Sequence, residues 1–507
     1  MSSKKAGVIL GYIAMAITNI SSFFLTPLML LVFGTSEFGV YKLVLSITSY
    51  FALADLGLSN AVIRYISEYR ANNDKESESK FVGLVGFIDL MIGGVLLVLG
   101  VLFYSYIPQI FKNSFTISEI GLLKKLFFLI VISGVFTLFL NLATALLKAY
   151  EKFPLLNVIN IIKTFVRTGL VAILLLSKFK SYEIVLVDTV LISIVFAYTS
   201  YYCLKNLNIT LRFKNFDINY SKKILSYSLI VFVDAVAFHF LMAADSFVIG
   251  IYISSKAIAI YSIGTLLSSL FFSFSIIISD VLMPDVVGKV TQGASNIQLT
   301  DYAIKIGRIK SILLALPIIG FVFFGKQFIH LWVGDDFSIA YYVALLVLVP
   351  QMISALMDVP LYIMWAKNKH KIKSFMSLGI SIINVGLTIF LVKKMGIIGA
   401  AISTCFAYVS VYLIFNTILY HKVLKLDMIR FVKEIFSKLW IGLFVASLGA
   451  YAISLYVSYN WFVLIFQFIT VSIIYITSIW FFGMNKSEKQ LILLPINKLR
   501  SKFKKTE

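Results

Sequence analysis

The sequence predicts an all-α integral membrane protein of about fourteen transmembrane helices, and three observations carry this prediction. Hydrophobic residues make up 60% of the 507 residues and charged residues only 14%, whereas about a quarter of an ordinary soluble domain is charged. The mean hydropathy is +0.94. Apolar runs of about 20 residues, enough to cross a hydrocarbon core of ~30 Å, recur along the whole chain.

Fourteen such runs can be delimited by their length and hydropathy. They lie near residues 6–33, 40–63, 81–104, 126–147, 155–176, 182–204, 224–252, 257–283, 311–333, 339–366, 374–392, 397–420, 439–459 and 461–483. The first run is too long for the core of a signal peptide, and no small-residue cleavage site follows it. We therefore expect it to be the first span and not a removed segment.

Basic residues are distributed unevenly between the two sides of the predicted membrane. With the N-terminus placed inside, 33 of the 45 Lys and Arg lie in the termini and inner loops, ten lie in or beside outer loops, and two lie within a span. This asymmetry follows the positive-inside rule, and an even number of spans makes both termini cytoplasmic. The formal net charge of +21 therefore indicates contact with anionic lipid head groups and not with nucleic acid.

Weak similarities recur at a separation of about 218 residues and indicate an internal repeat. The tripeptide SKK opens the first predicted span at residue 3 and the seventh at residue 221. FGTSEFGVY at 33–41 and YISSKAIAIY at 252–261 occupy the same place after the first helix of each half. The alternative is that apolar helices resemble one another through composition alone.

The repeat divides the chain into two lobes of equal orientation, because each contains six spans. We predict an N-terminal six-helix lobe, a C-terminal six-helix lobe, two additional transmembrane helices and a basic cytoplasmic tail, over residues 1–220, 221–425, 426–483 and 484–507 respectively. Two parallel lobes are typical of transporters that bind a substrate centrally and expose it to each side in turn.

Sequence motifs for nucleotide or metal chemistry are absent. The Gly-Lys pairs at 288 and 325 lack the glycine spacing and the following Ser or Thr of a phosphate-binding loop, so ATP hydrolysis by this chain is not expected. The four histidines form no metal-binding motif, and the two cysteines, Cys203 and Cys405, indicate neither a disulfide framework nor a Cys-rich site. We therefore expect no cofactor and no metal.

Two cations interrupt the fifth predicted span, in the stretch NIIKTFVRTGLVAILLL at 160–176. Lys163 and Arg167 are four residues apart and share a helix face. If the span enters from the inner side near residue 155, Lys163 lies roughly 12 Å and Arg167 roughly 18 Å into the hydrocarbon core. Each such charge costs about 2.5–3.5 kcal/mol to insert. Arg167 is too deep to reach either surface, so it needs an anion or a wet cavity.

One interpretation is that the two cations bind a substrate anion. Their counterparts in the second half are Ile380 and Asn384, so packing common to both halves does not require cations here. The fork of an Arg and the point charge of a Lys suit a phosphate or pyrophosphate. We therefore predict that Lys163 and Arg167 bind the pyrophosphate of the substrate.

The other interpretation is neutralisation by acids of the protein itself. Asp89, Asp234 and Asp358 lie at suitable depths in three predicted spans and are the candidate charge partners. A carboxylate in a cavity can also carry a proton, so Asp234 with His239 is the first candidate for ion coupling. Further acids within predicted spans are Asp55, Asp188, Asp245 and Asp280.

The stretch FGTSEFGVYKLVLSITSYFALADLGLSNAVIRYIS at 33–67 resembles the start of the polysaccharide flippases. These are the O-antigen and capsule repeat-unit exporters of the multidrug/oligosaccharidyl-lipid/polysaccharide superfamily. Four further stretches are similar to the family in order and spacing: LKAYEKFPLLNVINIIKT, DSFVIGIYISSKAIAIYSIGTLL, LWVGDDF and GIIGAAIST. Together the five stretches span almost the whole chain.

The resemblance implies two six-helix lobes plus two helices in the bacterial inner membrane. It also implies a flippase that moves an undecaprenyl-pyrophosphate-linked oligosaccharide repeat unit from the inner to the outer leaflet. Transport would use ion-gradient-coupled alternating access and would serve O-antigen or capsule biosynthesis. The expected partners are the lipid-linked oligosaccharide, membrane lipids and the polysaccharide polymerase machinery.

Two alternatives stay open at the level of sequence. A cation-coupled drug or metabolite antiporter of the same superfamily would use acids in its site, and eight acids lie in or at the edge of the predicted spans. A membrane enzyme of glycan assembly would be a different class of protein. The short outer loops and the lack of a recognisable catalytic cluster oppose the enzyme.

Overall fold

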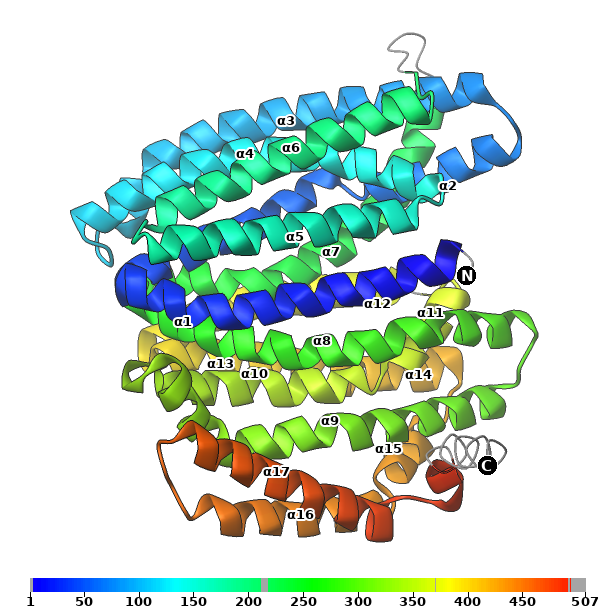
Figure 1. Cartoon of the computed structure of the whole chain (residues 1–507). Helices are drawn as coiled ribbons and strands as arrows, with labels where there is room; N and C mark the ends of the chain where they lie inside the picture. The colour runs from blue at the N-terminus through cyan, green and yellow to red at the C-terminus, as the bar shows by residue number, and fades with distance from the viewer. Residues whose placement is uncertain (1–2, 211–217, 370, 491–492, 494–507) are drawn as a thin grey trace, which may run out of the picture. The chain divides into compact units, whose positions relative to one another are not determined.

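The computed structural model describes residues 3–210, 218–369, 371–490 and 493 (Figure 1). All of its regular elements in these ranges are helices. They are α1 Ser3–Phe51, η1 Ala52–Asp55, α2 Leu58–Ala71, α3 Lys75–Phe111, α4 Ile117–Ala149, α5 Phe153–Leu176, α6 Ser181–Asn206, α7 Ile218–Tyr252, α8 Ser255–Thr291, α9 Asn296–Val333, η2 Asp335–Phe337, α10 Ile339–Ala355, α11 Asp358–Ala366, α12 Lys371–Met395, α13 Ile397–Tyr408, η3 Val409–Phe415, α14 Asn416–Leu424, α15 Met428–Phe436, α16 Leu439–Ser454, α17 Trp461–Ser478 and η4 Ile479–Gly483.

Helices long and apolar enough to cross a membrane number 12 in the described ranges, or 13 if the bent pair α15 and α16 is counted as one span. One of the 12 is the run Leu10–Ala71, whose 62 residues would extend about 93 Å as a straight helix, roughly three times the hydrocarbon thickness. The backbone of Gly34 breaks the run with φ 76° and ψ 168°, between the first two predicted spans. Counting the run as two crossings gives the predicted fourteen, and the all-α integral membrane fold is confirmed.

The chain forms two compact units that each combine separate parts of the sequence. Unit 1 contains the chain up to Ser262 together with Ser374–Ser403, and unit 2 contains Ile263–Lys373 together with the chain from Thr404 onward. The divisions fall within α8, α12 and α13 and not at the predicted lobe boundaries, 220 and 425. Those boundaries stay a prediction from the repeat. Of the predicted basic tail, 484–507, only residues 484–490 and 493 are among those described.

In unit 1, α1 packs along α4 and α5, and α4 packs against α3 and α6. Gly39 allows α1 to approach the start of α8 closely. A Cβ atom at Gly39 would lie 1.8 Å from the carbonyl oxygen of Ser255 and 3.3 Å from the backbone nitrogen of Ala259. The corresponding stretches of the two sequence halves, 33–41 and 252–261, therefore contact each other directly.

In unit 2, hydrogen bonds from Arg308 on α9 hold α15 and η4 in place. Its Nε and Nη2 donate to the two carboxylate oxygens of Glu488, at 2.5 and 3.2 Å. The remaining hydrogen bonds of its guanidinium go to the backbone carbonyls of Glu434, Ile435, Ser437 and Gly483. Carbonyls at helix ends lack partners within the helix, so this buried Arg satisfies the ends of α15 and η4 and holds both against α9.

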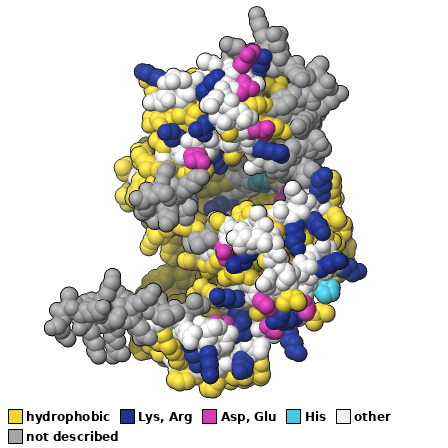
Figure 2. Space-filling model, turned by 90° about the vertical axis from the view of Figure 1, so that its right-hand side faces the viewer, with side chains coloured by type: hydrophobic (Ala, Val, Ile, Leu, Met, Phe, Trp, Pro, Cys, Tyr) yellow, Lys and Arg dark blue, Asp and Glu magenta, His cyan; other side chains and the backbone are white. Residues whose placement is uncertain are grey.

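Lys and Arg side chains are spread over the face of the molecule shown in Figure 2, with Asp and Glu interspersed. Exposed basic residues in the loops predicted to be inner include Arg64, Lys75, Lys305, Lys369 and Lys433. Their exposure fits contact with lipid head groups. The assignment of this side as cytoplasmic rests on the sequence.

The substitution Gly39→Ala is expected to destabilise unit 1, because its Cβ would overlap backbone atoms that cannot rotate away. Overpacking of this kind costs roughly 1–3 kcal/mol. The thermal unfolding midpoint of the purified protein in nanodiscs would measure the loss. Gly94→Ala on α3, where a Cβ meets nothing within 4 Å, is the matched control and should not lower the midpoint, because Ala favours a helix more than Gly does. Equal midpoints for the two variants would contradict the packing described here.

Candidate functional site

Arg167 on α5 forms an ion pair with Asp188 on α6. Its Nε donates to Asp188 Oδ1 at 2.5 Å, and its Nη2 donates to Oδ2 at 2.9 Å. This two-point contact is the geometry in which Arg binds carboxylates and phosphates most strongly. The two side chains keep 28% and 23% of their surface exposed, so a ligand can reach the pair.

The short connection between α5 and α6 explains this pairing. Only residues 177–180 separate the two helices, which therefore lie antiparallel and side by side (Figure 1). Arg167 lies nine residues before the end of α5 and Asp188 seven residues after the start of α6, so both have nearly the same depth. From the sequence alone, Asp188 is only one further acid within a predicted span. Two residues at similar distances before and after a short loop between antiparallel helices lie at similar depths. This rule would have paired Asp188 with Arg167.

The helix α1 contributes a hydroxyl group and a third cation beside this pair. The Nη2 atom of Arg167 donates to the Tyr41 hydroxyl over 3.4 Å. Lys42 is close enough to Arg167 for electrostatic repulsion, and the charge of Lys163 interacts with those of Asp188 and Arg167. We define these five residues, Tyr41, Lys42, Lys163, Arg167 and Asp188, as the cationic cluster. Its three cations face one acid, which leaves a surplus of two positive charges.

Lys163 lies one helical turn from Arg167, as the sequence predicts, and it makes neither a hydrogen bond nor an ion pair with any described residue. An unpaired ammonium in an apolar unit is expensive. The cationic cluster therefore carries positive charge that no described acid balances. One or more phosphate groups could balance it. Assignment of Lys163 and Arg167 to a substrate pyrophosphate stays a proposal at this point.

Among the described residues, no cation contacts Asp89 on α3. It is 2% exposed, and its Oδ1 has no hydrogen-bond partner among the described residues. The charge acting on it is that of Asp55, which accepts hydrogen bonds from the backbone nitrogen and the hydroxyl of Ser59 at 3.1 and 2.6 Å. The charge of Lys148 acts on Asp55 and no described cation contacts Asp89, so Asp89 stays a candidate for ion coupling.

Asp234 and His239 lie on the same helix, α7, and both are half-buried. Five residues along an α-helix correspond to a rotation of about 140° between the two side chains. The helix therefore directs them to different faces and does not build a shared site from these two residues. Each remains a separate candidate for ion coupling.

Asp358 in unit 2 pairs with Lys310, a cation just outside the predicted spans. The ammonium of Lys310 donates to Asp358 Oδ2 at 2.5 Å, to Ser279 Oγ at 2.6 Å and to the carbonyl of Ala355 at 2.7 Å. Lys310 was missed because α9 begins at Asn296, well before the predicted span at 311. Its side chain is 1% exposed and all three donors are satisfied, so this is a closed structural pair.

A second buried acid of unit 1, Asp245 on α7, accepts hydrogen bonds from hydroxyl groups. The Tyr261 hydroxyl donates to its Oδ2 and the Thr388 hydroxyl donates to its Oδ1 at 2.9 Å. It also acts electrostatically on Tyr50. From the sequence alone, Asp245 is only an acid within a predicted span, because its partners come from α12 and from α8.

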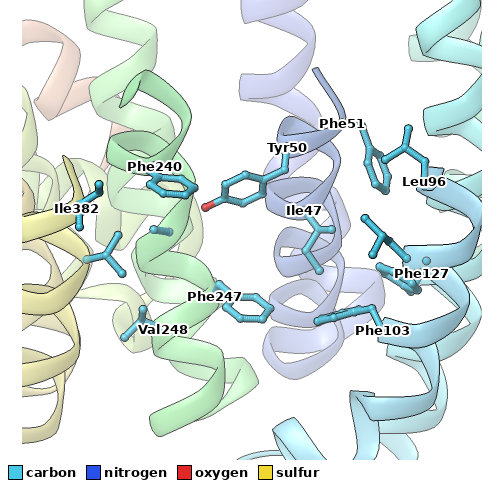
Figure 3. Close-up of a pocket in the computed structure, with 14 residues that line it drawn as sticks. Ile47, Tyr50, Phe51, Leu96, Phe103, Phe127, Phe240, Phe247, Val248 and Ile382 are labelled. Carbon is cyan, nitrogen blue, oxygen red and sulfur yellow. The ribbon is translucent and has the colours of Figure 1, made fainter. Parts of the chain in front are cut away.

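A cavity of about 550 Å³ lies in unit 1 beside α1 (Figure 3). Its walls are apolar apart from the Tyr50 hydroxyl. They are formed by Ile47, Tyr50, Phe51, Leu96, Leu99, Gly100, Phe103, Phe127, Phe240, Ala244, Phe247, Val248, Ile382 and Val385. Tyr50 lies nine residues after Tyr41, half a rotation around α1. The cavity therefore occupies the opposite face of α1 from the cationic cluster, and its lining suits hydrocarbon rather than phosphate.

Within the described ranges, no group of three or more His, Cys, Asp and Glu lies together in a way that could hold a metal ion. Cys203 and Cys405 are free thiols. The polar chemistry of the described chain is thus that of interhelical ion pairs and hydrogen bonds.

The membrane-spanning helices and the polar groups buried between them define a multi-pass integral membrane protein. Comparison with known structures agrees on the fold. A lipid II flippase MurJ in an inward closed conformation superposes with a TM-score of 0.70 and 17% identity, over 93% of this chain and 98% of that chain. An inward-facing multidrug resistance MATE family transporter of the MOP superfamily gives 0.61 and 13% identity, over 81% and 96%.

The family follows from the sequence itself. The family model described as "Polysaccharide biosynthesis protein" matches residues 5–286, more than half of the chain, and the chain belongs to this family. A protein of Shigella flexneri named "Putative O-antigen transporter" is 23% identical over 378 residues, which cover 73% of this chain and 86% of that protein. The resemblance to polysaccharide flippases is confirmed, and the chain is a multi-pass protein of the inner membrane.

The substitution Lys310→Ala is expected to lower the free energy of unfolding of unit 2 by about 1–3 kcal/mol, because it leaves the partly exposed carboxylate of Asp358 without its cation. Denaturant titration of the purified protein in mild detergent would measure the change. Lys305→Ala, at an exposed position of the same helix, is the matched control and should change stability by less than about 0.5 kcal/mol. If Lys310→Ala is as stable as its control, the pair does not hold the unit together.

Proposed function

We propose that this protein moves an oligosaccharide, linked through pyrophosphate to undecaprenol, from the inner to the outer leaflet for cell-surface polysaccharide biosynthesis. The family and the names of its relatives support this proposal. The observation that carries it is the surplus of two positive charges in the cationic cluster, on side chains that a ligand can reach. A pyrophosphate diester, with two negative charges, matches this surplus.

In this proposal Arg167 and Lys163 hold the pyrophosphate, and Lys42 adds long-range attraction. Arg supplies a planar pair of donors, while each Lys supplies a point charge with rotatable donors. The sugar would cross within the protein while the polyprenyl tail stays in lipid. Rocking of the two predicted lobes would expose the site first to one side and then to the other.

Export of an anion is favoured by an inside-negative membrane potential. Each negative charge that moves outward across the membrane gains about 2.3 kcal/mol per 100 mV. A proton or cation gradient would act in addition, through a carboxylate that can bind the ion. Asp89, with its unpartnered oxygen beside Asp55, is the first candidate for that role among the described residues. Asp234 and His239 are further candidates predicted from the sequence, whereas Asp358, also predicted, is paired with Lys310.

A cation-coupled antiporter of drugs or metabolites is the second candidate function. The buried Asp245, which accepts hydrogen bonds from Tyr261 and Thr388, is the kind of acid that such a transporter would use. The cationic cluster argues against a cationic cargo, because like charges repel. Increased drug sensitivity of a deletion strain with unchanged surface polysaccharide would favour this second function.

The proposed function predicts that removing the charge of Arg167 abolishes transport in a protein that still folds. The double substitution Arg167→Gln with Asp188→Asn removes both members of the ion pair and leaves neither charge unpaired. Loss of one charge-assisted hydrogen bond costs about 1.5–3 kcal/mol, so binding of the pyrophosphate should weaken roughly 10- to 100-fold or more. The measurement is transfer of a short-chain pyrophosphate-linked oligosaccharide to the opposite leaflet of proteoliposomes.

The variant Arg167→Lys keeps the charge but loses the fork, and it should retain partial transport. Arg64→Ala, at an exposed position of α2, is the control for loss of an arginine elsewhere. Wild-type rates in the double variant would show that the ion pair is structural and would withdraw the site. If the wild type itself fails to move the lipid, the substrate class is wrong and the antiporter becomes the leading function.

A further inference from the structure

The contact between Arg167 and Asp188 already occupies the groups that a phosphate would need. The Nε and Nη2 atoms form one edge of the guanidinium, and both donate to the Asp188 carboxylate. The Tyr41 hydroxyl accepts a further, longer contact from Nη2. A phosphate that binds this edge at two points must take the place of the carboxylate.

We propose that Asp188 is an internal competitor of the substrate for Arg167, an inference that rests on the proposed function. In the empty carrier the Asp188 carboxylate neutralises Arg167. When the diphosphate of the substrate arrives, it replaces Asp188 at Nε and Nη2. When the diphosphate leaves on the other side, Asp188 binds Arg167 again.

Displacement is favoured over a complex in which both anions share Arg167. A guanidinium that already holds a carboxylate has little net charge left to attract phosphate. A second anion at its other edge would also be repelled by Asp188. The exposure of both side chains, 28% and 23%, gives the phosphate access to the occupied edge.

A second cation, Lys163, can interact with the displaced carboxylate of Asp188. Lys163 already interacts with the charge of Asp188 and is repelled by that of Arg167. It makes no hydrogen bond or ion pair of its own within the described part of the chain. Transfer of Asp188 from Arg167 towards Lys163 would free the fork of Arg167 for phosphate without leaving a carboxylate unpaired. The three donors of the Lys163 ammonium allow it to contact the carboxylate and the phosphate together.

This arrangement separates the role of Asp188 from those of the cations. Arg167 and Lys163 provide affinity, whereas Asp188 limits affinity and neutralises Arg167 while the carrier returns empty. A carrier without Asp188 should bind the anion more tightly, release it more slowly and return more slowly. Asp188 is thus a positioning residue that sets the balance between binding and turnover.

The test uses the full chain in nanodiscs and proteoliposomes, with Asp188→Asn as the variant. Inorganic pyrophosphate serves as the binding probe and a short-chain pyrophosphate-linked oligosaccharide as the transport probe. We expect at least tenfold tighter binding of pyrophosphate and at least a tenfold lower maximal rate of transport. Asp285→Asn, at an exposed acid of unit 2, is the matched control and should change neither. Unchanged or weaker binding in Asp188→Asn would overturn the inference.

A second measurement does not depend on removing the acid. Infrared difference spectra of the wild type, with and without pyrophosphate, should show a shifted carboxylate band that moves to the glutamate frequency in Asp188→Glu. No shift would mean that Asp188 keeps its contact with Arg167, which also overturns the inference. If pyrophosphate binding to the wild type does not depend on Arg167 at all, it is the proposed function that fails.

Discussion

A cation inside an apolar helix bundle must be neutralised by an anion. In this protein the neutralising acids come from other segments of the chain, so the ion pairs constrain which helices pack together. Removing one member of a buried ion pair leaves the other without compensation, at a cost that can exceed a third of the stability of a domain. Three cations are each bound by an acid from a different segment: Arg167 by Asp188, Lys310 by Asp358 and Arg308 by Glu488. These pairs fix which segments lie together within each unit.

The three pairs differ in whether any positive charge remains unbalanced. Lys310 has an acceptor for each of its three donors, and Arg308 binds a carboxylate together with four backbone carbonyls. Both are buried and complete, which is what a structural role requires. Arg167 is partly exposed, and Lys42 and Lys163 add charge that Asp188 alone does not balance. Of these three pairs, this one alone leaves positive charge unbalanced by the described acids.

Two helix hairpins of unit 1, which the predicted repeat matches to each other, differ in their chemistry. In the first half α5 and α6 are joined by Arg167 and Asp188, and in the second half Asn384 on α12 accepts a hydrogen bond from Ser403 on α13 at 2.6 Å. Asn384 is the counterpart of Arg167 in the repeat. A neutral pair is therefore sufficient to pack such a hairpin, and the charges of the first half need another explanation. Recognition of an anionic cargo provides one.

The sequence by itself determined the membrane class, the positions of the spans and the presence of two cations in the fifth span. It could do so because hydropathy and the spacing of residues on one helix are local properties. The tertiary structure alone decided which side chains pair across helices. Asp188 meets Arg167 through the α5–α6 hairpin, Lys42 and Tyr41 arrive from α1, and Lys310 proved to be a buried residue of α9. Which side chains meet across helices depends on helix rotation and packing, and hydropathy carries no information about either.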